Sequence, residues 1–187
     1  VNDGISMVQI MEGTYDEVTS ILQRMRDMAV QAANGSLSST EQGYLETEQT
    51  ALQSALNDAL EQATFSNIDL ADNTSASVIS ISIQAGSNTG DAVSIALTSA
   101  NASNASGLGI TAIDLSSDAS AAIGLADAAI GHVATQRAQL GAYQAQLEST
   151  VRNLSNVAEN TAAAAGRIMD TDYAAETANL TKAQILQ

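Results

Sequence analysis

The stretch from Ile123 to Ile168 reads IGLADAAIGHVATQRAQLGAYQAQLESTVRNLSNVAENTAAAAGRI and carries a heptad-like repeat of mostly apolar side chains. The repeat positions alternate at spacings of three and four: Ile123, Ala126, Ile130, Val133, Arg137, Leu140, Gln144, Leu147, Val151, Leu154, Ala158, Thr161, Ala165 and Ile168. This spacing places them along one seam of a helix, because two turns of a slightly under-wound helix take seven residues. At 1.5 Å per residue the helix would extend for about 70 Å. This length and the apolar seam predict a rod that needs partner helices.

Two polar residues, Arg137 and Gln144, interrupt this seam. A buried guanidinium without a partner is costly. Either both residues make contacts that fix the register within a bundle, or this part of the seam faces another subunit. The pattern favours neither explanation.

Two further helices are predicted upstream, at residues 1–33 and 39–64. The first has its own seam of Gly4, Val8, Met11, Tyr15, Val18, Leu22, Met25, Ala29 and Ala32, and Asn34-Gly35 is a natural stop. Capping boxes at Ser38/Glu41 and Ser39/Gln42 predict the start of the second helix. Its seam is Leu45, Gln49, Leu52, Leu56, Ala59 and Ala63. The short connection favours an antiparallel pair.

The region after the second helix is polar and loses helical periodicity. Phe65, Ile68 and Leu70 are expected to plug the end of the core. Two period-two segments, Ile79/Ile81/Ile83 and Val93/Ile95/Leu97, flank a Gly/Asn turn at residues 86–90, which predicts a β-hairpin within residues 77–98. Residues 99–107 read as a polar loop, and Ser116, Ser117 or Asp118 is expected to cap the third helix, at 118–170. The seam slips at 170–173, which suggests a junction with another helical layer.

Composition excludes several functional classes. The chain has 21 acids against six bases, for a formal charge of −15, so nucleic acid is a poor partner and an anionic membrane surface equally so. No segment is apolar for long enough to insert in a membrane. The absence of cysteine removes disulfides and thiolate chemistry, and the absence of proline lets helices run long.

Candidate chemical sites are weak. Acids at Asp69/Asp72 and at Asp170/Asp172/Glu176 lack the ligand pattern of a calcium loop. His132 is the single histidine, and such a residue is more often packed than catalytic. Triplets such as Asn73-Thr74-Ser75 and Asn101-Ala102-Ser103 are expected by chance in so Asn- and Ser-rich a chain. We therefore expect no catalytic residue, no metal site and no cofactor.

Five ordered blocks resemble bacterial flagellin: residues 2–6 (NDGIS), 22–31 (LQRMRDMAVQ), 137–142 (RAQLGA), 167–173 (RIMDTDY) and 175–186 (AETANLTKAQIL). The resemblance implies a mainly α, rod-like antiparallel bundle of three long helices with a packed β-hairpin, at residues 1–173. It implies that 174–187 begin the helix of the filament core, that further terminal helices lie outside Val1–Gln187, and that the family's variable outer domains are missing.

The resemblance also implies an interaction surface, used by neighbouring protofilaments and by Toll-like receptor 5. Its charged pair corresponds to Arg24 and Glu48, and Met28 stands where the family usually has Leu. On the long helix, Ala126 replaces a larger aliphatic residue. The candidate set is Gln23, Arg24, Met28, Gln31, Glu48, Leu52, Ala126, Asp127 and Ile130.

The function implied by the resemblance is that of a structural subunit, not an enzyme, which polymerises into the extracellular flagellar filament for motility. An export chaperone, capping or junction proteins and the receptor are the implied partners, besides identical subunits. Export without a cleaved signal peptide is implied as well. The alternative is a flagellin-like surface adhesin or binding protein.

Overall fold

The computed structural model describes residues 1–34, 36–71, 78–86, 88, 90–98, 108–110, 113–115 and 118–186. It consists of two compact units, Val1–Leu147 and Glu148–Gln187. The third and longest helix, α3 (Ala119–Ile185), contributes to both. The predictions for Gly35, Asp72, Asn73-Thr74-Ser75, the 99–107 loop, and Ser116 and Ser117 as caps lie outside the described residues, as do the side chains at 170–174.

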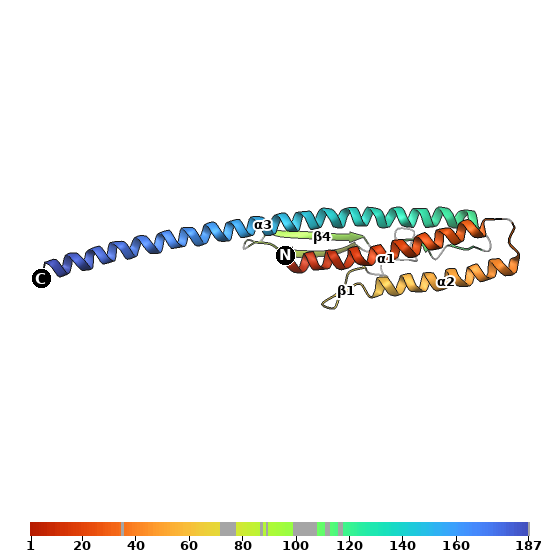
Figure 1. Ribbon diagram of the computed structural model, residues 1–187, viewed down its shortest axis with the longest axis horizontal. Coiled ribbons are helices and arrows are strands. Elements are labelled where there is room, and N and C mark those ends of the chain that lie inside the picture. Colours follow the sequence, from red (N-terminus) through yellow and green to blue (C-terminus); the bar gives the residue numbers. More distant parts are fainter. Residues whose placement is uncertain are drawn as a thin grey trace. The chain divides into compact units, whose positions relative to one another are not determined.

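Helix α1 (Asn2–Ala32) forms the centre of the first unit. Every residue of its predicted seam is buried, from Gly4 to Ala32, and Met7, Ile21 and Met28 widen the buried stripe. A stripe this wide lets α1 bury apolar surface against more than one neighbour. Figure 1 shows α1 with α2 on one side and α3 on the other.

Helix α2 (Ser39–Glu61) returns antiparallel to α1 after a short connection (Figure 1). The Ser38/Glu41 capping box is confirmed: the Glu41 backbone N–H donates to Ser38 Oγ, and the Ser38 N–H donates to Glu41 Oε2 at 2.8 Å. Ser39 is the first helical residue and so does not cap. On the core side, Gln49, Leu56 and Leu60 are buried.

The N-terminal part of α3 completes the bundle antiparallel to α1. Asp118 caps it by accepting the Ala121 N–H at 2.9 Å. Its buried stripe is Ala122, Ala126, Ala129, Val133, Gln136, Leu140 and Leu147. The predicted seam is therefore right at every second position, whereas Ile123, Ile130, Arg137 and Gln144 are only half-buried. In the first turns of α3 the buried positions are Ala122, Ala126 and Ala129, and the larger Ile123 and Ile130 flank them, partly buried against the core.

The predicted hairpin is confirmed as antiparallel strands β3 (Val78–Gln84) and β4 (Ala92–Thr98), with Ile81 opposite Ile95 and Ile83 opposite Val93. Val93 and Ile95 are buried in the core. Tyr143 of α3 holds the strand edge, since its hydroxyl accepts the Ala96 N–H at 3.2 Å and donates to the Ala96 carbonyl at 3.3 Å. An isolated hairpin is marginal, so these contacts stabilise it.

A second, very short hairpin joins β1 (Thr64–Phe65) to β2 (Ile68–Asp69) and was not anticipated. Its turn residues Ser66 and Asn67 have φ of 49° and 66°, the left-handed conformation that two-residue hairpin turns require. The prediction that Ile68 plugs the core is wrong: its side chain is 41% exposed, because the turn carries it outward, whereas Leu70 is fully buried.

The apolar residues Leu108, Ile110, Ile113 and Leu115 also enter the core. Two side chains of α2 hold this segment: Gln53 donates to the Ile110 carbonyl at 3.0 Å, and Glu46 accepts the Leu115 N–H at 3.0 Å. The segment thus covers a face of the bundle that helices alone would leave open.

The second unit consists of the C-terminal part of α3. The backbone stays helical through residues 170–173, where we expected a junction, because neither Gly nor Pro interrupts it. The expected helices at 118–170 and 174–187 are therefore one. Among the described residues, no helix is both long enough and apolar enough to cross a membrane.

Candidate interaction surface

A groove lies between α1 and α2, here called the α1/α2 groove. The side chains from α1 are spaced by three and four residues, so they share one helical face. The lining residues are Glu17, Ser20, Ile21, Gln23, Arg24, Asp27, Met28 and Gln31 from α1, and Leu45, Glu48 and Leu52 from α2. Six of the predicted interface residues are among them: Gln23, Arg24, Met28, Gln31, Glu48 and Leu52.

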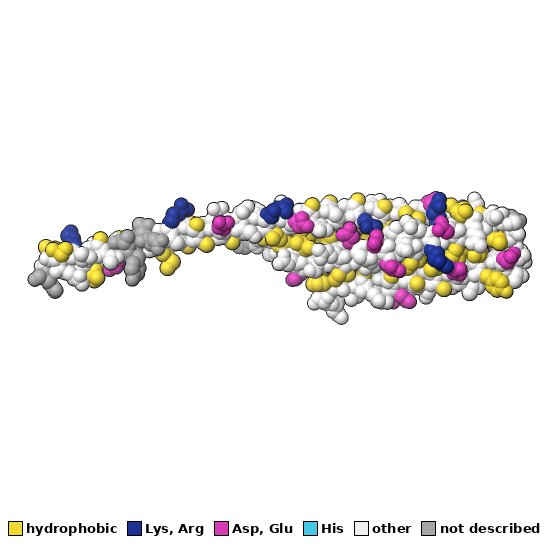
Figure 2. Space-filling view, viewed as in Figure 1, with side chains coloured by type: hydrophobic (Ala, Val, Ile, Leu, Met, Phe, Trp, Pro, Cys, Tyr) yellow, Lys and Arg dark blue, Asp and Glu magenta, His cyan; other side chains and the backbone are white. Residues whose placement is uncertain are grey.

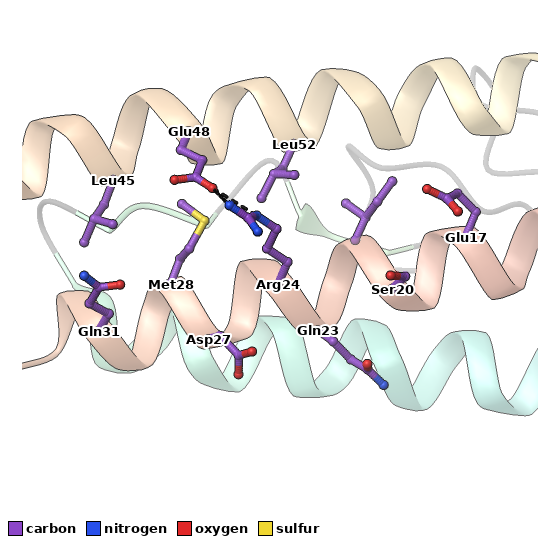
Figure 3. Close-up of a pocket in the computed structure, with 11 residues that line it drawn as sticks. Glu17, Ser20, Gln23, Arg24, Asp27, Met28, Gln31, Leu45, Glu48 and Leu52 are labelled. Carbon is purple, nitrogen blue, oxygen red and sulfur yellow. Dashed lines mark hydrogen bonds and ion pairs between the residues drawn. The ribbon is translucent and has the colours of Figure 1, made fainter.

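The groove is bridged by an ion pair between Arg24 and Glu48. The Arg24 Nε donates to Glu48 Oε1 at 2.9 Å, and a second guanidinium nitrogen contacts the same oxygen. Figure 3 shows Arg24 extending from α1 toward Glu48, with Met28 beside it, whereas Gln23 and Asp27 point away from α2. The bridge leaves apolar side chains on either side of a charged centre.

The side chains of Arg24 and Glu48 are 65% and 40% exposed. An exposed ion pair contributes about 0–1 kcal/mol to stability, because water and salt screen it and two long side chains must be ordered. Stability alone therefore gives little reason for this arrangement. Both groups remain available to a partner that brings its own charges.

The three predicted positions on α3 do not join the groove. Ala126 is fully buried in the core, so it is not offered to a partner from this unit. Asp127 accepts a hydrogen bond from Arg26 of α1 at 2.6 Å, and Ile130 is half-buried against the core. The structure thus places these residues at the contact between α1 and α3.

Arg137 pairs with Asp16 of α1 at 3.0 Å and keeps 36% of its side chain exposed. Arg26–Asp127 and Asp16–Arg137 together fix an antiparallel register between α1 and α3. Gln144 is half-buried. The deeply buried polar residues of the described chain are Gln49 and Gln136, at 0% and 3% exposed. Gln49 lies on the predicted seam of the second helix, whereas Gln136 lies one residue before the predicted α3 seam.

Tyr15 is buried within the bundle, and His132 is partly buried there. Burial raises the pKa of Tyr15 to about 12, so its phenol stays protonated. Burial lowers the pKa of His132 below its ordinary value of 6.5, because imidazolium is disfavoured away from water. The His132 Nδ1 is buried and has no hydrogen-bond partner among the described residues.

We expect His132 to make the bundle less stable as the pH falls through 6.5. The unfolded chain binds a proton on His132 near pH 6.5, and the folded chain binds it only at lower pH. Between these values the unfolded state holds more protons, so acidification favours unfolding. His132→Gln should flatten the dependence of Tm on pH in this window, and parallel Tm profiles for the two proteins would contradict the assignment.

The described part of the chain shows no arrangement of side chains that would form a metal site, and the face shown in Figure 2 has no basic patch. No three His, Asp or Glu side chains gather there in a way that could hold a metal. Asp69 accepts the Ala71 N–H at 3.1 Å, which is a local turn contact. Figure 2 shows Lys and Arg as isolated side chains on the visible face, without a basic patch.

The second unit carries an exposed apolar stripe, here called the α3 apolar face. At 100° per residue its members fall within an arc of about 120°. They are Leu154, Val157, Ala158, Thr161, Ala165, Ile168 and Met169, and all are exposed. The exposed fraction rises from 37% at Leu154 to 73% at Met169. No side chain among the described residues of this unit buries the stripe.

Two family models match the chain. The model of the bacterial flagellin N-terminal helical region matches residues 1–76, and that of the bacterial flagellin C-terminal helical region matches residues 123–187. The crystal structure of Bacillus cereus flagellin superposes with a TM-score of 0.66 over 81% of this chain and 86% of that one. Its sequence is 23% identical, so this comparison supports the fold.

Curated relatives extend over nearly the whole chain. A flagellin of Halalkalibacterium halodurans is 37% identical over 98% of this chain and 67% of its own length. Flagellin A of Vibrio anguillarum is 30% identical in an alignment of 292 residues that covers all of this chain and 76% of the relative. A flagellar filament 31.3 kDa core protein of Treponema maltophilum is 33% identical over 98% of this chain and 68% of the relative.

Proposed function

This chain belongs to the bacterial flagellin family, and from this premise we propose how it assembles. As a flagellin it is a structural subunit that polymerises with identical copies into the flagellar filament. We propose that the contacts between copies bury the α1/α2 groove and the α3 apolar face. No finding among the family models or relatives supports the adhesin alternative.

The observation that carries this proposal is the exposure of the α3 apolar face. Ile168 and Met169 are 68% and 73% exposed, and Leu154 and Val157 lie on the same side of the helix. Soluble monomers rarely leave a large contiguous apolar patch in water, and such a patch marks an interaction site. In a filament, an identical subunit is the partner present at high local concentration.

Electron microscopy tests the proposal. The chain would carry, at both ends, the terminal segments of the 37% identical flagellin, because that relative is longer than this chain. We expect filaments after salting out. Soluble, folded monomers under conditions that polymerise the relative itself would overturn the proposed assembly.

The remaining family features belong to the same proposal. Residues 1–173 would form the rod domain, and 174–187 would begin the helix of the filament core. We also propose export without a cleaved signal peptide, assisted by a chaperone and by capping or junction proteins. The absence of cysteine and an aromatic content of only 3% suit passage through a channel as an unfolded chain. The length of the alignment with Flagellin A supports a form without outer domains.

A second function, recognition by Toll-like receptor 5, is supported by the same groove. Arg24 is 65% exposed and lies beside Glu48 and the half-buried Leu52, whereas Met28, at 5% exposed, offers little surface to a partner. The burial of Ala126 removes that position from the proposed contact. Receptor binding would therefore rest on α1 and α2.

We expect Arg24→Ala to weaken receptor binding roughly tenfold to a hundredfold, because hydrogen bonds to a charged group contribute about 1.5–3 kcal/mol. The measurement is a calorimetric titration with the purified receptor ectodomain. Arg152→Ala, which removes an exposed Arg from the second unit, is the matched control and should bind like the parent. Equal affinities for Arg24→Ala and the parent would exclude the groove as the epitope.

A further inference from the structure

The five methionines of the chain divide sharply by exposure. Met7, Met11, Met25 and Met28 on α1 are 0–8% exposed, within the core of the first unit. Met169 on α3 is 73% exposed. A reagent in solution therefore reaches one thioether sulfur directly and the other four only after the bundle opens.

The helical turn that precedes Met169 has only small side chains beside the thioether. A helical side chain leans toward the N-terminus and lies over the residues three and four positions earlier. For Met169 these are Gly166 and Ala165, which have no side chain or a single methyl. The space beside Gly166 is open, since an added Cβ would meet nothing within 4 Å. Neither neighbour can shield the thioether.

We propose that Met169 is a redox-sensitive modification site, oxidised selectively by peroxides to the sulfoxide, and that the sulfoxide suppresses subunit assembly. In the reaction, the thioether sulfur attacks one oxygen of hydrogen peroxide. An S–O bond forms, the O–O bond breaks, and the departing hydroxide takes the proton of the transferred oxygen and leaves as water. Sulfur loses the two electrons that peroxide gains, and a methionine sulfoxide reductase can reverse the change.

The effect on assembly follows from the position of Met169 and rests on the proposed function. Met169 lies on the α3 apolar face beside Ile168. The sulfoxide is a strong hydrogen-bond acceptor and has no partner in an apolar contact, so burying it is costly. In the free subunit the same group faces water and costs nothing. Oxidation thus penalises the assembled state alone.

Peptide mapping by mass spectrometry tests the chemistry on the free chain. With limiting hydrogen peroxide, we expect the Met169 peptide to oxidise at least about tenfold faster than the peptides of Met7, Met11, Met25 and Met28. Circular dichroism should show that the bundle stays folded during the reaction. Equal rates at all five methionines in the folded protein would overturn the proposed selectivity.

A polymerisation assay on the end-extended chain tests the consequence. We expect oxidation to raise the critical concentration roughly tenfold, and sulfoxide reductase to restore it. Met169→Leu keeps the apolar volume but cannot be oxidised, so its critical concentration should not change with peroxide. If the oxidised parent assembles like the untreated parent, the proposed control by Met169 is wrong although the filament function stands. If untreated protein forms no filaments, the proposed assembly fails, and the oxidation rates still decide the selectivity.

Discussion

Leu22→Ala is expected to lower the free energy of unfolding of the first unit by about 2–5 kcal/mol. Leu22 is fully buried near the middle of the α1 stripe, between Val18 and Met25, which are also fully buried. Truncation removes the transfer free energy of the lost methyl groups and leaves a cavity. Three long helices with ion pairs that fix their register cannot close that cavity by moving one side chain. The loss should therefore lie toward the upper end.

Urea unfolding followed through tyrosine fluorescence provides the measurement, because Tyr15 is buried in this unit. Ile10→Ala is the matched control. It removes a large aliphatic side chain from the same helix at a position that is 37% exposed, so its cost should be much smaller. Equal losses for Leu22→Ala and Ile10→Ala would mean that α1 does not form the centre of the core.

Most of the α1 core could be predicted from the sequence, although Met7, Ile21 and Met28, which widen it, lie outside the predicted seam. Its seam contains Val8, Met11 and Leu22, all large, and the opposite face is polar, so only one orientation buries the apolar side chains. The same holds for the β3–β4 hairpin, where period-two alternation leaves a single register with isoleucines facing the core. In α1 and in the hairpin, the periodic pattern and the size of the side chains point to the same buried face.

The α3 seam could be predicted only in part, for a reason that lies in its composition. Ile123, Ile130 and Arg137 share the three-and-four spacing with Ala122, Ala129 and Gln136, one residue earlier. Size and apolarity favour the isoleucines. The packed bundle instead buries Ala122, Ala129 and Gln136, and Ile123 and Ile130 remain partly buried at the edge of the core. Which of the two adjacent stripes of α3 is buried depends on how the partner helices pack against it. The sequence of α3 alone does not specify that packing.

The contacts across helices show the same limit. The resemblance suggested that Arg24 and Glu48 act together, and the structure pairs them. The pairs Arg26–Asp127 and Arg137–Asp16 depend on the vertical register between α1 and α3, which periodicity within one helix does not specify. The remaining groove residues, such as Glu17 and Asp27, could have been found by extending the α1 face in steps of three and four from Arg24.

Replacing Leu154, Val157 and Ile168 together by Gln is expected to abolish filament formation at concentrations where the parent assembles. The three side chains are 37%, 53% and 68% exposed, so their folded environment loses little when they become polar. In a subunit contact they would bury the remaining apolar surface, a loss of roughly 3 kcal/mol. The critical concentration should rise about a hundredfold.

The matched control changes three exposed residues of α3 that lie outside the α3 apolar face: Asn153, Asn156 and Asn160 to Gln. It keeps these positions polar and uncharged, so the control should assemble like the parent. Both triple variants should keep the helical content of the parent by circular dichroism, since Gln is a good helix former.

Filaments from the Leu154/Val157/Ile168 variant at the parent's critical concentration would show that α3 is not an assembly surface. The groove between α1 and α2 would then have to supply the affinity alone, even though its ion pair is screened by water and its apolar area is divided by charge. A stripe of uncovered aliphatic side chains on one long helix is the stronger physical basis for polymerisation, and this comparison of two faces of that helix isolates it.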